Sequence, residues 1–174
     1  MVLSEEFIKY VNKKIIIDTN RLLLLLIGNY DEANGSNFLK NFKEYSKEDY
    51  EILKKFISQL NIKIVITPHI LSEISDMINN EIKPENNFEK VIEWLSKVSN
   101  VLKEIQENDV EKNIILDEDV VKKLGFTDTS IIITSRENGL PVLTGDIKLS
   151  GECNKKRLDV ISYDVVKSMG MGFY

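Results

Sequence analysis

One carboxylate interrupts the most apolar stretch of the chain. Residues 13 to 31 read KKIIIDTNRLLLLLIGNYD, so Asp18 lies between three isoleucines and five leucines. A carboxylate that leaves water without a partner is costly. A helix that crosses a membrane needs about 20 apolar residues, and this run is shorter and contains Asp18 and Arg21. We therefore expect a buried strand followed by a helix, with Asp18 at the junction, where the backbone turns toward solvent.

Composition indicates one globular domain over residues 1–174. The chain is 43% hydrophobic and 29% charged, and its length suffices for one hydrophobic core. Its only cysteine, Cys153, excludes an intramolecular disulfide framework and favours a cytoplasmic location. The net charge of -5 gives no sign of a basic nucleic-acid-binding surface. Bound metal ions could still supply positive charge at a site for nucleic acid.

Short apolar segments alternate with helical patterns along the chain. We expect strands over residues 13–18, 63–67, 141–146 and 157–163, with a fifth over 111–116. Amphipathic or capped patterns predict helices over residues 46–60, 67–80, 84–108, 116–125 and 127–139. This alternation predicts an α/β fold with a mostly parallel sheet that is covered on both faces. In such folds ligands bind beyond the carboxyl ends of the strands.

Four acids are expected to meet at that edge of the sheet. Asp18 ends the first strand, Asp146 follows the strand that begins at residue 141, and Asp128 lies where a helix begins. Glu73 lies at the border of the apolar stripe of its helix and can point toward a cleft. Asp76 on the same helix is expected to face solvent instead.

Acids that meet in this way would repel one another unless they took up protons or bound a cation. Mg²⁺ and Mn²⁺ prefer oxygen ligands and are commonly held by a few carboxylates together with substrate phosphates. Such an ion can activate water and neutralise charge on a phosphodiester. The pattern therefore predicts a divalent-metal site made by Asp18, Glu73, Asp128 and Asp146.

Four short motifs carry a resemblance to a known family. They are IIIDTN, then SEI within a helix, then TDTSII at the start of a helix, then LTGD after a strand. In this order they resemble the PIN-domain (PilT N-terminus-like) nucleases, which include the toxin ribonucleases of toxin–antitoxin modules. The resemblance extends from residue 14 to about residue 163.

The resemblance implies a three-layer α/β/α fold with a central, mostly parallel sheet. It also implies an endoribonuclease that depends on Mg²⁺ or Mn²⁺. By position, the four acids named above correspond to the acidic residues of the family. Asn20, Ser130 and Thr144 fall where polar residues often support the metal shell. RNA is the implied substrate, and a toxin member would have an antitoxin protein as partner.

The chain departs from compact toxin members in one segment. Residues 29–61 form a probable insertion, which puts the toxin role in doubt more than the nuclease chemistry. This insertion and the long helix around Trp94 could form a homodimer face, although a monomer is equally consistent. The basic run at 155–157 could steer a phosphate backbone or be a solvated loop.

Simpler interpretations stay open for each residue. Asp18 alone could be a helix cap, and the other acids could be solvated or turn residues. His69, in the first turn of its helix, is expected to have a surface or rim role. A non-catalytic PIN-fold module that binds RNA or protein is the main alternative function. A phosphatase would need a second acid where Asn20 stands, so we consider it less favoured.

Overall fold

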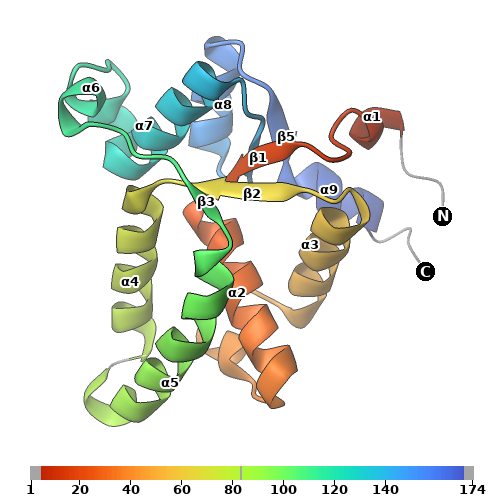
Figure 1. Cartoon of the computed structure of the whole chain (residues 1–174), viewed down its shortest axis with the longest axis vertical. Helices are drawn as coiled ribbons and strands as arrows, with labels where there is room; N and C mark the ends of the chain where they lie inside the picture. Colours follow the sequence, from red (N-terminus) through yellow and green to blue (C-terminus); the bar gives the residue numbers. More distant parts are fainter. Residues whose placement is uncertain (1–4, 83, 171–174) are drawn as a thin grey trace.

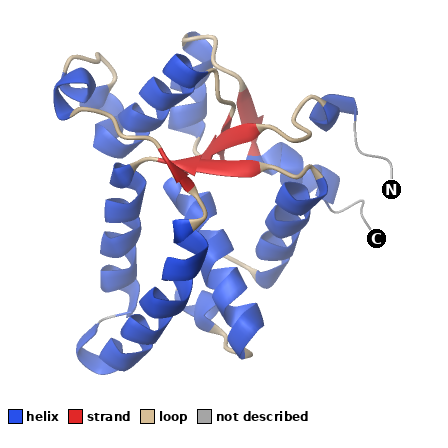
Figure 2. Ribbon diagram, in the orientation of Figure 1, coloured by secondary structure: helices blue, strands red, loops and turns tan. Residues whose placement is uncertain are grey.

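A five-stranded sheet lies at the centre of the computed structural model, which describes residues 5–82 and 84–170. Its strands are all parallel and lie in the order β3-β2-β1-β4-β5. The strands are β1 (Lys14–Ile17), β2 (Lys63–Ile66), β3 (Gln106–Glu107), β4 (Val142–Thr144) and β5 (Val160–Ser162). Helices cover the sheet (Figure 2), in agreement with the α/β/α fold expected from the sequence.

Helices fill the connections between these strands, precede the first strand and follow the last one. They are α1 (Glu5–Ile8), α2 (Thr19–Asn34), the 3₁₀ helix η1 (Phe38–Asn41), α3 (Lys47–Gln59), α4 (Pro68–Ile82), α5 (Pro84–Lys103), α6 (Lys112–Leu116), α7 (Val121–Asn138), α8 (Ile147–Lys155) and α9 (Tyr163–Gly170). In Figure 1, α2, α3, α4 and α5 lie on one side of the sheet, and α6, α7 and α8 lie on the other. Helix α9 packs against α3.

The apolar run of the sequence forms the centre of the core. All three isoleucines of β1 are fully buried, and so are Leu22, Leu23, Leu24 and Leu26 of α2. Helix α2 is apolar on nearly all sides because α3, α4 and α5 surround it. Each buried side chain of this size stabilises the fold by about 1.5–3 kcal/mol. Within the described residues, no helix is long and apolar enough to cross a membrane.

Helix α2 has one position at which a side chain would not fit. A Cβ built on Gly28 would lie 2.0 Å from Cδ2 of the Tyr50 ring. Tyr50 belongs to α3 and is almost fully buried. Gly28 therefore allows α2 and α3 to pack closely.

The expected strand at 111–116 is wrong, because these residues include helix α6. Only Ile115 is buried, whereas Ile114 and Leu116 are exposed. A short apolar run does not distinguish a strand from a helix. The fifth strand is β3, a two-residue edge strand whose side chains are both exposed, so it has no apolar pattern to find.

The expected helix boundaries agree well with the structure at two positions. Ser46 and Asp49 form a capping box at the start of α3. Gly125 interrupts α7 with a φ of 82°, so the expected break between two helices occurs there as a kink. This kink determines the direction of the α7 segment that carries Asp128.

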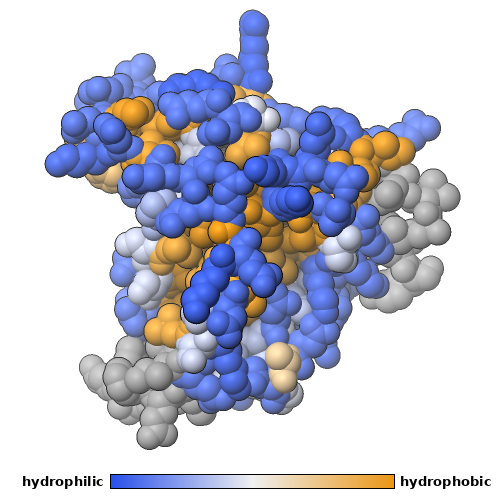
Figure 3. Space-filling view, viewed as in Figure 1, coloured by the Kyte–Doolittle hydropathy of each residue, from blue (hydrophilic) through white to orange (hydrophobic). Residues whose placement is uncertain are grey.

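Apolar surface remains visible around the end of α5. Figure 3 shows hydrophobic side chains between charged ones on this face of the molecule. A groove of about 590 Å³ at this end of the sheet is lined in part by Leu25, Ile64, Val101 and Ile105. It lies beside the beginnings of β1 and β2, so it is separate from the edge where the strands end.

Candidate functional site

The connections of the sheet create a crevice between β1 and β4. From β1 the chain proceeds to β2 and β3 on one side, and it then returns to β4 on the other side. In open α/β sheets, ligands bind at such a reversal, beyond the carboxyl ends of the strands. Asp18 directly follows β1, and Asp146 lies two residues after β4.

Asp18 is buried at this crevice, with a relative exposure of 4%. It caps α2, because its Oδ1 accepts a hydrogen bond from the Arg21 backbone N–H at 2.7 Å. Its Oδ2 accepts from the Thr144 hydroxyl and from the Gly145 N–H. Burial raises the pKa of Asp18, whereas the Thr144 hydrogen bond and the Arg21 charge lower it. The acid that interrupts the apolar run is therefore well supplied with hydrogen-bond donors.

Thr144 connects Asp18 to Asp146. Its hydroxyl donates to Asp18 and accepts from the Asp146 N–H at 2.9 Å. Asp146 caps α8, because its Oδ1 accepts from the N–H groups of Lys148 and Leu149 at 2.6 and 2.9 Å. Thr144 thus fixes the positions of the residues that end β1 and follow β4.

Glu73 reaches the same region from α4. The Thr19 hydroxyl donates to Glu73 Oε2 at 2.6 Å, although Glu73 itself is exposed. Thr19 is buried in the first turn of α2, directly after Asp18. The sequence did not indicate a role for Thr19, because its partner is 54 residues away. Asp76 on α4 is also exposed, as expected.

Asp128 differs from the other three acids in having no hydrogen-bond donor within the described residues. It is half-buried on α7, just beyond the Gly125 kink. Burial, together with the negative charges of Asp146, Glu73 and Asp18, raises its pKa from 3.8 to about 7. The four acids therefore share one electrostatic neighbourhood.

They do not share a tight coordination geometry. Among the described residues, no three Asp, Glu, His or Cys side chains are arranged closely enough to hold a metal ion. The donor chemistry nevertheless fits. A carboxylate has about four acceptor positions, and Asp18 uses three of them, whereas Asp146 and Glu73 use two and one. Oxygen lone pairs of the kind that Mg²⁺ and Mn²⁺ prefer are thus left free, above all on Asp128.

Asn20 and Ser130 position neighbouring elements. Asn20 Oδ1 accepts a hydrogen bond from the Tyr45 hydroxyl at 2.9 Å. Ser130 is buried, donates to the Thr127 carbonyl at 2.7 Å and lies 2.8 Å from the Thr67 hydroxyl. Ser130 therefore joins the α7 segment that carries Asp128 to the end of β2.

Arg21 brings a positive charge to the site. Its Nε lies 4.0 Å from Asp18 Oδ1, and its side chain is 16% exposed. The guanidinium carbon lies 4.4 Å from the centre of the Tyr163 ring and 5.9 Å from that of Tyr45. The sequence did not reveal this arrangement, because the two rings come from distant segments.

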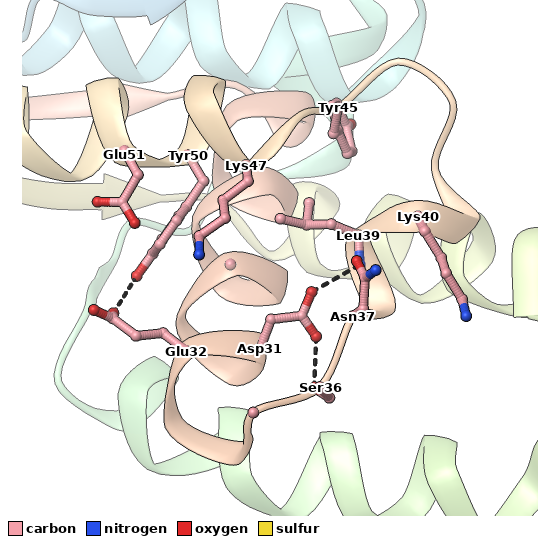
Figure 4. Close-up of a pocket in the computed structure, with 12 residues that line it drawn as sticks. Asp31, Glu32, Ser36, Asn37, Leu39, Lys40, Tyr45, Lys47, Tyr50 and Glu51 are labelled. Carbon is pink, nitrogen blue, oxygen red and sulfur yellow. Dashed lines mark hydrogen bonds between the residues drawn. The ribbon is translucent and has the colours of Figure 1, made fainter.

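A cavity of about 710 Å³ lies beside this site, within the 29–61 segment. Figure 4 shows Tyr45, Lys47 and Tyr50 around it, with Asp31 hydrogen-bonded to its neighbours. Of the four acids, none lines this cavity. Tyr45 contributes to both the cavity wall and the surroundings of Arg21.

The remaining candidate groups lie at the rim. His69 is half-buried, and its Nδ1 has no hydrogen-bond partner in the described part of the chain. In the basic run, Lys155 pairs with Glu152 and Lys156 pairs with Glu118. These two cations are therefore partly neutralised by α8 itself and by the loop before α7.

No model of a protein family matches this chain, and no curated protein matches it either. The functional assignment consequently depends on the motifs, the crevice between β1 and β4, and the four neighbouring acids.

Proposed function

We propose that this protein is a PIN-like endoribonuclease that depends on Mg²⁺ or Mn²⁺. The observation that carries the proposal is the mutual influence of four acids from four segments at the β1–β4 crevice. Burial and the charges of the other three acids together raise the pKa of Asp128 to about 7. Strongly perturbed acids in a crevice are typical of functional sites. RNA in the cytoplasm is the substrate that we propose.

Asp18 and Asp128 would be the primary ligands of the cation, and Glu73 and Asp146 would ligate it directly or through water. The bound cation would supply activation of water and neutralisation of phosphodiester charge. Thr144 holds Asp18 and the backbone of Asp146 close together, because its hydroxyl hydrogen-bonds to both. Thr19 keeps Glu73 directed toward the start of α2. Each acid thus has a polar neighbour or a helix end that limits its freedom, except Asp128.

Asp128 makes the proposed activity sensitive to pH. With its pKa near 7, it carries a proton in much of the population at neutral pH. A carboxylate must lose its proton before it binds a metal. Metal binding and cleavage should therefore both strengthen as the pH rises through 7.

The direct test is cleavage of a single-stranded RNA with Mg²⁺ or Mn²⁺. We expect the wild type to cleave and Asp18→Asn to lose the activity, because the substitution removes a charge at the crevice while keeping the shape. Asp76→Asn is the matched control, since Asp76 is exposed on the same helix as Glu73. Equal cleavage by all three proteins would contradict the assignment.

A non-catalytic PIN-fold module that binds RNA or a protein partner is the second candidate. The absence of a tight three-ligand cluster within the described residues favours it. Calorimetric titration with Mn²⁺ separates the two proposals. Binding below millimolar ion supports the enzyme, and no binding at millimolar ion supports the module. A neighbouring antitoxin gene would further indicate a toxin.

A further inference from the structure

Arg21 is a half-buried cation whose Nε–H has no partner among the described residues. Its guanidinium has five N–H donors, and it contacts the Tyr163 and Tyr45 rings and lies 4.0 Å from Asp18. The Nε atom is buried, and the side chain is 16% exposed. Buried polar groups without partners are rare and costly in native proteins. This one therefore requires an explanation.

Asp18 does not account for the position of Arg21. An arginine that serves to neutralise a carboxylate usually forms paired hydrogen bonds with N–O distances of about 2.7–2.9 Å. Here the closest approach to Asp18 is 4.0 Å. The Asp18 oxygens instead accept from backbone N–H groups and from Thr144. The Arg21 donors are left available to another group.

Two tyrosines hold the guanidinium in place. Its carbon lies 4.4 Å from the Tyr163 ring centre and 5.9 Å from the Tyr45 ring centre, and the faces of aromatic rings attract a cation at such distances. Both rings are themselves fixed. The Tyr163 hydroxyl donates to the Asp49 carbonyl at 2.8 Å, and the Tyr45 hydroxyl donates to Asn20. The cation is thus positioned before any ligand arrives.

The guanidinium also lies beside the loop that carries Asp146. A Cβ built on Gly145 would lie 3.6 Å from the guanidinium carbon and 3.7 Å from Nε. An anion that approaches the four acids meets their repulsion, and Arg21 brings a positive charge beside Asp18 and Gly145. Arginine matches phosphate oxygens with two parallel N–H donors and tolerates burial better than lysine.

We infer that Arg21 binds a phosphodiester group of a single-stranded RNA at the β1–β4 crevice. This inference rests on the proposed function, because it names the contact that holds the RNA substrate of that site. The contact would position the strand next to the acids, without taking part in bond cleavage. Arg21 is in this sense a positioning residue.

The test is RNA binding without cleavage, in EDTA, followed by fluorescence anisotropy of a labelled RNA oligonucleotide at several salt concentrations. Each phosphate contact with a single strand contributes about 0.7 to the slope of log affinity against log salt. We expect Arg21→Gln to weaken binding on the order of tenfold and to lower this slope by about 0.7. Arg136→Gln is the matched control, because Arg136 pairs with Glu118 on the protein surface. It should leave both quantities unchanged.

A purely structural role for Arg21 would leave the salt slope as it is, so an unchanged slope overturns the inference even if the wild type cleaves RNA. Should Arg21→Gln not fold, the Arg21 Nε–H resonance of the wild type decides by NMR. A shift of this resonance on adding RNA, with none at Arg136, supports the contact, and no shift overturns it. RNA binding through Arg21 without metal-dependent cleavage would contradict the proposed nuclease but not this inference.

Discussion

Asp31 and Asp128 are the same type of side chain in opposite circumstances. Asp31, in the 29–61 segment, accepts hydrogen bonds from the Ser36 hydroxyl and from the N–H groups of Phe38 and Leu39, at 2.6, 2.7 and 2.9 Å. Asp128, at the sheet edge, accepts none from the described residues, and its neighbours are other acids. Asp31 stabilises a loop, whereas Asp128 is held where its charge is unfavourable.

The difference extends to the regions around them. In the 29–61 segment, Glu32 pairs with Lys54, and Asp49 pairs with Lys167. The hydrogen bonds that Glu32 accepts from Lys54 and Tyr50 lower its pKa. At Asp49, burial raises the pKa, but the hydrogen bonds from Lys167 and Ser46 outweigh burial, so the pKa is lowered. Glu32 and Asp49 thus have basic partners, whereas Asp128 at the β1–β4 crevice has acids as its charged neighbours. Strongly perturbed pKa values of this kind cluster at functional sites.

Removing one acid from each region should affect RNA cleavage very differently. We expect Asp128→Asn to lower metal-dependent cleavage on the order of 100-fold or more, because Asp128 would hold the cation that neutralises developing charge. Asp31→Asn should change it less than twofold, because Asp31 contacts only its own loop. Initial cleavage rates at saturating Mn²⁺ measure both effects. Comparable losses in the two variants would remove the distinction between the regions.

A methyl group added at Gly28, which packs on Tyr50 of the 29–61 segment, should reduce stability more than one added at Gly145, beside the β1–β4 crevice. We expect Gly28→Ala to destabilise the fold by about 2–3 kcal/mol, because the new Cβ would meet the buried Tyr50 ring. At Gly145 the nearest atom to an added Cβ is 3.6 Å away, an ordinary contact. Gly145→Ala should therefore cost less than about 0.5 kcal/mol. Urea unfolding of both variants gives the comparison, and equal midpoints would contradict the packing described here.

Neutralising Asp128 should stabilise the protein at alkaline pH. Its folded pKa of about 7 exceeds its ordinary value of 3.8, so the folded state loses stability as the pH rises from 4 to 7. Asp128→Asn removes this loss, and we expect a gain of about 1–2 kcal/mol at pH 8 after allowing for solvent screening. The gain should vanish near pH 4. Thermal unfolding at several pH values measures it, and Asp31→Asn, which loses hydrogen bonds, should be destabilised instead.

The smallest expected effect is a proton released on metal binding. At pH 6, Asp128 is mostly protonated in the free protein, so Mn²⁺ should displace about one proton. At pH 8 it should displace almost none. Calorimetry in two buffers of different ionisation enthalpy measures the number released. Binding without proton release at pH 6 would place the metal away from Asp128.

Much of the fold could be predicted because local pattern and tertiary packing agree. The isoleucines of β1, the capping box at Ser46 and the break at Gly125 each have a local cause that the sequence displays. Strand β3 has no such cause. Its two exposed residues pair with β2 only because α5 delivers the chain to the sheet edge.

In the candidate site, too, some residues could be predicted from the sequence and others could not. Asp18 and Asp146 follow β1 and β4, so their placement at one edge of the sheet could be expected from topology. The support of the acids could not, because Thr19, Arg21 and Tyr163 act through partners that are distant in sequence or set by tertiary packing. A side-chain direction of this kind depends on the packed structure, and the sequence does not display it.

The hydrogen bond from Thr144 to Asp18 spans 126 residues. During synthesis, β1 leaves the ribosome long before β4 exists, so Asp18 then lacks its partner and its neighbour Asp146. The crevice is complete only after residues 142–146 have emerged and the crossover that leads to β4 has formed. A nascent chain that ends before Thr144 therefore lacks the hydrogen bonds that assemble the proposed site.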